Sequence, residues 1–442
     1  MKLKKLPLAL GTVLLASLSV AHAVDPSEFK TIEQRVSAIE SKMINWRRDI
    51  HQHPELSNQE HRTAKLVAEH LRSLGLEVQT GVANSTGVVA ILRGRQPGKV
   101  IALRADMDAL PVKELVDLPF ASKAKGKHMG KEVDVMHACG HDAHTAILMA
   151  TAEILSGMKD KVRGTVKFIF QPAEEGMSEP HSEDDHIGAE AMVRAGVLDN
   201  PKVDAVFGLH VNPWFPTGTV AYRPGAILAS GDTFMMKVTG KQAHGAFPWA
   251  GIDSVMATSQ IVMGLQTIVS RQLELIKEPA IISIGSIHGG SRENIIPESV
   301  ELLGTVRTFD DSMRQDTLQR MRTTAEHIAM SSGAKAEIKI QKPGGYAATV
   351  NNEDLTARML PTLQQATGGK AVLTSKLSAS DDFAEFAKKV PGLFFFLGST
   401  SPSADLKKAP PNHSPKFELD EASLAVGART MTAMVIDYLR QP

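Results

Sequence analysis

The chain has 442 residues, which is too long for one ordinary hydrophobic core, so two domains are expected. Hydrophobic residues make up 43% and charged residues 22%, a composition typical of folded globular proteins rather than disordered ones. The formal net charge is zero and aromatic residues reach only 5%, which argues against a nucleic-acid or anionic-membrane partner.

The first 23 residues have the pattern of a signal peptide. Lysines at positions 2, 4 and 5 precede an apolar run over 6–20, and Ala21-His22-Ala23 supplies the small residues of a cleavage site. The run is too short for a comfortable membrane span. We therefore expect cleavage near Val24 and a periplasmic or secreted protein with no membrane attachment; an uncleaved anchor is the alternative.

Residues 26–76 show mainly helical periodicity, with a break at His53-Pro54. After them, apolar β-rich runs alternate with helical segments, which indicates a mostly parallel sheet covered on both faces and an α/β fold. The predicted strands cover 87–92, 100–105, 165–171 and 203–210, and the predicted helices cover 143–156 and 189–195.

The middle of the chain has a different pattern. Its predicted order is β-α-β-β-α-β, which is that of a ferredoxin-like sandwich inserted into the larger domain. The strands are expected at 233–238, 280–287, 300–308 and 336–340, and the helices at 252–271 and 312–330. The sequence then returns to the first domain, with a helix at 354–366, a strand at 392–397 and a helix at 420–438.

These elements predict four segments in chain order. The expected boundaries are a signal peptide at 1–23, a first catalytic part at 24–228, an inserted domain at 229–342, and a second catalytic part at 343–442. Pro343-Gly344-Gly345 is the expected linker on the far side of the insertion.

Cys139 is the one cysteine of the chain, so it forms no internal disulfide, and it lies among the histidines at 137, 141 and 144. A thiolate and an imidazole two residues apart, beside Gly140, can converge on one site at a helix start. Both are good ligands for zinc-like ions. A buried cysteine near surface histidines is the simpler alternative, but the three flanking histidines favour a metal site.

Glu174 and Glu175 are adjacent carboxylates that follow a predicted apolar strand. They repel each other unless cations lie beside them, so one can bind metal while the other accepts a proton from water. In an open parallel sheet, active sites lie beyond the carboxyl ends of the strands. Other predicted strands deliver Asp106, Asp108 and His210 to the same edge. The sequence therefore predicts one metal-dependent active site there.

From about Ile32 to the C-terminus, the chain resembles the amidohydrolase branch of the M20 metallopeptidases. That branch includes hippurate hydrolases, N-acyl-amino-acid deacetylases and plant auxin-conjugate hydrolases. It implies a di-metal exopeptidase-like catalytic domain with an inserted lid and dimerisation domain. The matching motifs lie at 47–57, 103–111, 139–145, 174–176, 208–210, 240–248, 292–298, 380–383 and 413–415.

The resemblance assigns roles in catalysis, substrate binding and metal binding to individual residues. Glu174 would be the general base, and Asp108 would orient a ligand histidine. In the inserted domain, His244 would stabilise the oxyanion, either within its own chain or across a dimer interface, while Asn294 and Arg307 would contact the substrate's carboxylate end. The ligands of two divalent ions would be Cys139, His141, Glu175, His210 and His413.

Three positions depart from the family pattern. Related branches carry histidine where Asp106 stands, so Asp106 is not assigned to the metal. The segment 177–187 resembles an insertion that is either a solvated acidic loop, which we favour, or an extra cation site. Asp381 replaces the more usual glutamate, which shortens one side chain of the pocket.

The expected reaction is hydrolysis of the amide bond in small N-acyl amino acids or amino-acid conjugates. The alternatives are a dipeptidase, carboxypeptidase or amino-acid amidase using the same site, a non-catalytic metal- or ligand-binding protein, and a cysteine hydrolase with Cys139 as nucleophile. The ligand set suits zinc or manganese, with cobalt or nickel as further options. A homodimer or higher homo-oligomer is expected, and no nucleic-acid partner.

Overall fold

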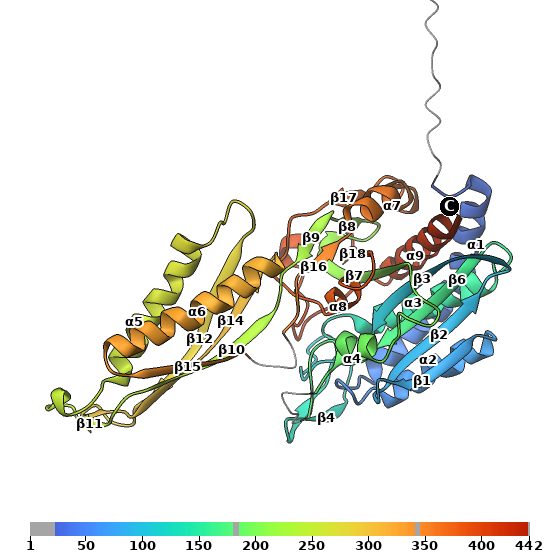
Figure 1. Cartoon of the computed structure of the whole chain (residues 1–442). Helices are drawn as coiled ribbons and strands as arrows, with labels where there is room; N and C mark the ends of the chain where they lie inside the picture. Colours follow the sequence, from blue (N-terminus) through green and yellow to red (C-terminus); the bar gives the residue numbers. More distant parts are fainter. Residues whose placement is uncertain (1–22, 180–184, 341–344, 441–442) are drawn as a thin grey trace, which may run out of the picture.

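The computed structural model describes residues 23–179, 185–340 and 345–440 (Figure 1). The predicted signal peptide lies outside these residues apart from Ala23. Val24 is fully buried: its backbone N–H donates to Gln365 Oε1 at 2.9 Å, and Gln365 Nε2 donates to its carbonyl at 3.0 Å. Among the described residues, none of the helices combines the length and apolar character needed to cross a membrane.

Two helices begin the described chain, α1 (Pro26–Gln52) and α2 (His61–Ser73). Asp25 caps α1 by accepting a hydrogen bond from Ser27 N, and Pro26 occupies the first helical position, where no backbone donor is needed. The predicted break after α1 is confirmed.

The larger sheet has eight strands in the order β1-β2-β6-β3-β7-β18-β8-β17. The pairs β6–β3, β3–β7, β7–β18 and β8–β17 are parallel, so the prediction of a mainly parallel sheet is confirmed. The strands β1 and β2 at one edge, and β8 near the other, run antiparallel to neighbours. The strands are β1 (Glu77–Val82), β2 (Gly87–Arg93), β3 (Gln96–Asp106), β6 (Arg163–Gln171), β7 (Ala205–Pro216), β8 (Val220–Tyr222), β17 (Ala371–Leu373) and β18 (Gly392–Thr400).

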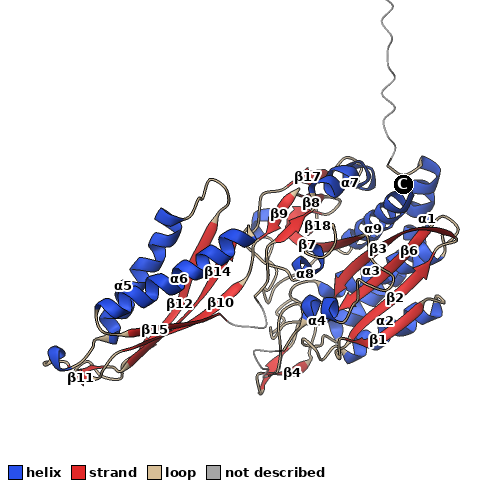
Figure 2. Ribbon diagram, in the orientation of Figure 1, coloured by secondary structure: helices blue, strands red, loops and turns tan. Residues whose placement is uncertain are grey.

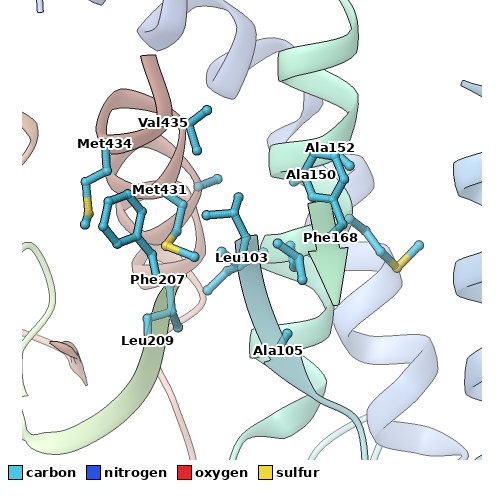
Figure 3. Close-up of a cluster of buried hydrophobic side chains, with 14 of the residues drawn as sticks. Leu103, Ala105, Ala150, Ala152, Phe168, Phe207, Leu209, Met431, Met434 and Val435 are labelled. Atoms are coloured by element: carbon cyan, nitrogen blue, oxygen red, sulfur yellow. The ribbon is translucent and has the colours of Figure 1, made fainter. Parts of the chain in front are cut away.

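Helices cover both faces of this sheet (Figure 2). The helices α1, α3 (His141–Ser156) and α9 (Ala422–Arg440) pack together on one face, and α7 (Glu353–Ala366) packs on α9. The other face is covered by α4 (Gly188–Arg194) and α8 (Phe383–Ala387). Figure 3 shows Leu103 and Phe207 against Met431 of α9, in the apolar core between the sheet and the helices α1, α3 and α9. Alternate strand residues are therefore buried on both faces, as expected for a covered sheet.

A second unit lies in the chain between β8 and β17. It contains β10 (Asp232–Thr239), α5 (Ser254–Thr267), β12 (Ala280–Gly289), β14 (Ser299–Thr308), α6 (Asp311–Ser331) and β15 (Lys335–Ile340). Its four strands are antiparallel in the order β12-β14-β10-β15, and α5 and α6 cover one face with a separate apolar core.

This second unit extends away from the larger sheet (Figure 1). Its far tip carries β11 (Ala243–His244) paired with β13 (Ile295–Ile296). Phe247 and Trp249 lie in the same tip, with exposures of 53% and 79%. The unit therefore places an exposed aromatic tip at a distance from the eight-stranded sheet.

Candidate metal centre and active site

The polar residues that the sequence assigns to one edge of the sheet do come together there. Asp106 ends β3, Glu174 follows β6 by three residues, and His210 lies in β7. The prediction that β7 ends at His210 is wrong, because the strand continues to Pro216 by pairing with β18 as far as Thr400. His210 therefore projects from a continuous, hydrogen-bonded strand.

Gly140 shapes the turn that presents Cys139 and His141. It precedes α3 with φ of +97°, a left-handed conformation that glycine adopts without strain. A side chain there would also place Cβ 2.3 Å from Val211 Cγ2. The turn therefore requires glycine both for its backbone conformation and for its close approach to β7.

All five predicted metal ligands belong to one cluster with Glu174. The Cys139 Sγ atom lies 3.3 Å from His210 Nε2, and His413 Nε2 lies 3.0 Å from Glu175 Oε1. In three overlapping groups the possible ligand atoms all lie within 4.8 Å of one another. These groups are Cys139/His141/His210, Cys139/Glu175/His413 and His141/Glu174/Glu175.

Two of the histidines are oriented through the ring nitrogen that faces away from the cluster. His141 Nδ1 lies 3.2 Å from Asp108 Oδ1, and His210 Nδ1 donates to the Val211 carbonyl at 2.8 Å. Within the described chain, the buried Nε2 of His141 has no hydrogen-bond partner. An imidazole held in this way leaves a nitrogen available to a metal ion.

Asp108 connects three parts of the site. Besides facing His141, its carboxylate accepts hydrogen bonds from Ser57 Oγ at 2.7 Å and from Glu175 N at 3.0 Å. This is the geometry of an outer carboxylate that orients a ligand histidine and the backbone of a neighbouring ligand. Ser57 belongs to the motif at 47–57, and the sequence alone assigns it no role.

The cluster has an excess of buried negative charge. Burial, Asp381 and Glu175 raise the pKa of Glu174 well above its usual range, and burial, partly opposed by Arg104, raises the pKa of Asp382 to about 8. The carboxylates involved are Asp106, Asp108, Glu174, Glu175, Asp381 and Asp382.

The cysteine and histidine protonation states also fit a cation. Burial and the charge of Glu175 raise the pKa of the Cys139 thiol, so it stays protonated without a neighbouring positive ion. Burial lowers the pKa of His210, which keeps its imidazole neutral, as a metal ligand requires. A divalent ion would stabilise the thiolate and the carboxylates together. The donor set therefore fits bound metal better than a free cysteine nucleophile.

Arg104 is a buried cation behind the cluster that the sequence analysis did not assign. It donates from Nη1 to Asp106 at 2.6 Å, from Nη2 to Asp382 at 2.9 Å, and from Nε to Gln171 at 2.8 Å. A charged residue in the apolar run 100–105 was the available signal, because a buried arginine needs partners.

Asp106 is occupied by contacts within the protein. In addition to Arg104, it contacts His144 Nδ1 at 2.6 Å, and His144 Nε2 accepts a hydrogen bond from Val211 N at 2.8 Å. Both nitrogens of His144 are therefore used. The pair joins β3, α3 and β7, and together with His141 it forms a further group whose possible ligand atoms lie within 4.8 Å of one another.

Three residues of the inserted unit have predicted roles at the active site, and the structure does not bring them together. Arg307 of β14 lies beside the cluster, where its Nη1 donates to Ser380 Oγ at 2.8 Å. His244 and Asn294 lie instead at the distant tip formed by β11 and β13 (Figure 1). Sequence motifs could not indicate this, because the separation depends on how far β10 and β14 extend. Within one chain, His244 and Asn294 do not reach the cluster.

A cavity of about 410 Å³ opens beside the donors. One part of its wall is apolar and includes Trp214, Leu228, Leu377 and Phe396. The polar part includes Arg307 with Asn212, Ser380 and Asn412, in addition to the cluster residues. Such a cavity suits a small molecule with a carboxylate at one end and an apolar group at the other.

The segment predicted to be either an acidic loop or a cation site is only partly described, since His181, Glu183 and Asp184 lie outside the described residues. His186 Nδ1 lies 3.1 Å from Glu190 Oε1 of α4, an exposed pair. This contact leaves both interpretations of the segment as predictions.

Known proteins resemble the chain over most of its length. The sequence profile of peptidase family M20/M25/M40 matches residues 102–437. Thermostable carboxypeptidase 2 of Saccharolobus solfataricus is 41% identical over 92% of this chain and 98% of its own. N-acetylcysteine deacetylase of Bacillus subtilis is 38% identical over 91% and 98%. The crystal structure of the Bacillus subtilis YXEP protein, a dinuclear metal binding peptidase from the M20 family, matches with TM-score 0.74 at 36% identity, covering 92% of this chain and 100% of that one.

Proposed function

The chain belongs to peptidase family M20/M25/M40, and we propose that it hydrolyses the amide bond of small N-acyl amino acids or amino-acid conjugates. The observation that carries this proposal is the convergence of Glu174 with five metal-type donors, four of which line a cavity together with Glu174 and Arg307. A base, a cation site and a carboxylate-binding group then lie around one small-molecule cavity.

The metal site proposed here takes two divalent ions. Cys139, His141, Glu175, His210 and His413 would hold them, because these donors combine sulfur, imidazole and carboxylate groups in overlapping sets of three, and the ligand atoms of each set lie within 4.8 Å of one another. When bound, the ions would activate water at neutral pH and place positive charge near the substrate's carbonyl oxygen. Zinc or manganese suits this mixed donor set, and cobalt or nickel is also compatible.

Glu174 is proposed to move the proton. It accepts a proton from the attacking water and gives it to the nitrogen of the leaving amine as the amide bond breaks. Burial and the neighbouring carboxylates raise the pKa of Glu174, which makes its carboxylate a stronger proton acceptor than an exposed one, and the charge of bound ions would oppose this shift. Arg307 would bind the carboxylate of the amino-acid product, for which a planar guanidinium is suited.

The inserted unit is proposed to act as a lid and as a dimer contact. His244 lies on an exposed tip beside Phe247, with ring centroids 5.3 Å apart. Because the tip is distant from the cluster of its own chain, His244 would stabilise the oxyanion of a partner subunit. Mixing Glu174→Gln with His244→Ala protein should restore activity that neither has alone; absence of restoration under subunit exchange counts against action in trans.

Export is proposed from the pattern of residues 1–23. A buried and hydrogen-bonded Val24 suits a mature chain that begins there. N-terminal sequencing of protein recovered from the periplasm or medium of the producing cell should give Val24 as the first residue. Recovery of an intact Met1 chain would contradict this assignment.

A carboxypeptidase or dipeptidase activity is the second candidate, because thermostable carboxypeptidase 2 shares 41% of its residues with this chain. An amino-acid amidase would use the same base and ions, but its substrate has no free carboxylate for Arg307 to bind. A non-catalytic binding protein would not need Glu174 beside the donors.

The deciding experiment compares substrates on the metal-loaded protein. Benzoylglycine, N-acetyl amino acids, dipeptides and amino-acid amides are offered at equal concentration, and kcat/KM is measured for each with metal content determined in parallel. Higher kcat/KM for the N-acyl amino acids supports the proposal. A dipeptide preference supports the second candidate, and a metal-loaded protein inert on all four classes rejects both.

A further inference from the structure

The backbone on each side of Glu174 is held by a side chain from elsewhere in the sequence. On the upstream side, Ala173 has φ of +53°, a left-handed conformation that is strained for a residue with a Cβ. Its N–H donates to Oε1 of the fully buried Glu60 at 3.0 Å. This contact helps to keep the strained turn that directs Glu174 into the site.

On the downstream side, the hydroxyl group of Tyr346 donates to the backbone carbonyl of Glu174 at 2.8 Å. Tyr346 also lines the cavity. The Glu174 carboxylate itself accepts a long hydrogen bond, 3.4 Å, from Asp382 N. The carbonyl contact of Tyr346 is therefore the shorter of these two restraints on the position of Glu174.

Tyr346 is also part of the connection to the inserted unit. Its N–H donates to the Gly231 carbonyl at 2.8 Å, and Gly231 N donates to the Tyr346 carbonyl at 3.0 Å. Gly231 immediately precedes β10, whose first residue, Asp232, accepts two hydrogen bonds of 2.7 Å from Arg314 of α6. The outgoing chain and the returning chain are thus hydrogen-bonded to each other here, in addition to the pairing of β9 (Gly225–Leu228) with β16 (Thr349–Asn351).

This junction has little free space. A Cβ on Gly231 would lie 2.6 Å from Ser380 Oγ and 2.7 Å from Arg307 Nη1. Ser230, one residue earlier, donates its N–H to the Thr308 carbonyl at 2.7 Å. A displacement of the inserted unit at this junction therefore moves the backbone of Tyr346 with it.

We propose that Tyr346 is a positioning residue that couples the junction of the inserted unit to the general base. This inference rests on the proposed role of Glu174 as that base. The two backbone hydrogen bonds tie Tyr346 to the start of β10, and its hydroxyl group ties it to the peptide that carries Glu174. Movement of the inserted unit changes the position of Glu174 through this side chain.

The kinetic test is Tyr346→Phe in the full-length, metal-loaded protein. Loss of one well-placed hydrogen bond should lower kcat for an N-acyl amino acid about tenfold, with KM within about twofold of the original value. Metal content should not change, because none of the five donors is altered. Tyr222→Phe makes the same chemical change in β8, outside the site, and should leave both constants unchanged. An unchanged kcat in Tyr346→Phe, or a loss confined to KM, would overturn the proposal.

Hydrogen–deuterium exchange tests the coupling without turnover. In Tyr346→Phe, backbone amides in a peptide covering 172–177 and in one covering 228–232 should both exchange faster, about tenfold where the lost hydrogen bond limits opening. Tyr222→Phe should show neither change. Unchanged exchange in either peptide rejects the coupling. This readout decides the inference even if the protein hydrolyses none of the offered amides, so the two failures are distinguishable.

Discussion

Glu174 lies beside the proposed metal ligands, and its replacement directly tests its proposed role as the general base. Glu174→Gln keeps the shape of the side chain but removes the proton acceptor, so kcat should fall about 10³-fold, within the usual contribution of general-base catalysis. The bound metal should remain, and elemental analysis checks this. Glu190→Gln, on the exposed side of α4, is the matched control. Retention of substantial activity by Glu174→Gln would reject the assigned base.

Asp108 offers a test of the metal site that leaves all five donors in place. Asp108→Asn removes the negative charge facing His141 Nδ1 and weakens acceptance from Ser57 and Glu175. Metal affinity should fall about 10- to 100-fold, as for other partners that orient ligands. Competition with a chromophoric chelator measures this, with exposed Asp160→Asn as control. Equal affinity in both variants would show that Asp108 does not orient a ligand.

For single residues, the sequence predicts the metal donors and the base better than it predicts the residues that orient them. Glu174 and His210 could be placed because each follows, or lies in, an apolar run whose end defines a sheet edge, and Cys139 because three histidines flank it at a helix start. The roles of Arg104 and Tyr346 could not be predicted in the same way. Their contacts depend on which distant segments the fold brings behind them, and no local pattern contains that information.

The turn before α3 is an element that depends on one glycine. Gly140→Ala introduces a Cβ at φ of +97° and at 2.3 Å from Val211 Cγ2. The free energy of unfolding should fall by about 2–4 kcal/mol, combining backbone strain with overpacking. Gly75→Ala is the matched control, since its φ is +74° and no atom lies within 4 Å of the added Cβ. Chemical denaturation measures both, and equal losses would show that contact with β7 contributes nothing.

The strand β6 carries a buried lysine that makes stability depend on pH. Lys167 Nζ donates to the carbonyls of Val197, Asn200 and Pro201, and burial lowers its pKa to about 8. Between pH 8 and 10.5 the unfolded chain holds a proton that the folded chain lacks, so stability increases with pH there. Relative to that of Lys167→Met, the free energy of unfolding of the native protein should rise by up to about 3 kcal/mol across this window. Denaturation at several pH values tests this, and a parallel dependence in both proteins would contradict it.

Long elements were predictable and short ones were not. The strands β3, β6 and β18 have continuous apolar runs, and α6 has helical spacing with an Asp310 cap, so their patterns define them. By contrast, β8 and β17 have three residues each, and β1 is mostly exposed. Such strands are held by backbone hydrogen bonds to a neighbour, which leave no periodic apolar signature.

For the whole molecule, the proposed metal centre connects distant segments of the chain. Removing metal should lower the melting temperature, because ions that bind only the folded state stabilise it by about 2.7 kcal/mol at a hundredfold excess over Kd. This corresponds to a few degrees for a chain of this size. Differential scanning fluorimetry with and without chelator measures the shift, and His413→Ala should reduce it. Identical melting of the loaded and stripped forms would contradict a metal site that joins these segments.

The order in which the donors occur along the chain determines when an ion can be captured. Cys139 and His413 belong to the same group of ligand atoms, although the whole second unit and the strands on either side of it lie between them in the sequence. A ribosome must therefore synthesise almost the entire polypeptide before the binding site can assemble. The complete set of proposed ligands is therefore available to an ion only after nearly the whole chain has been made.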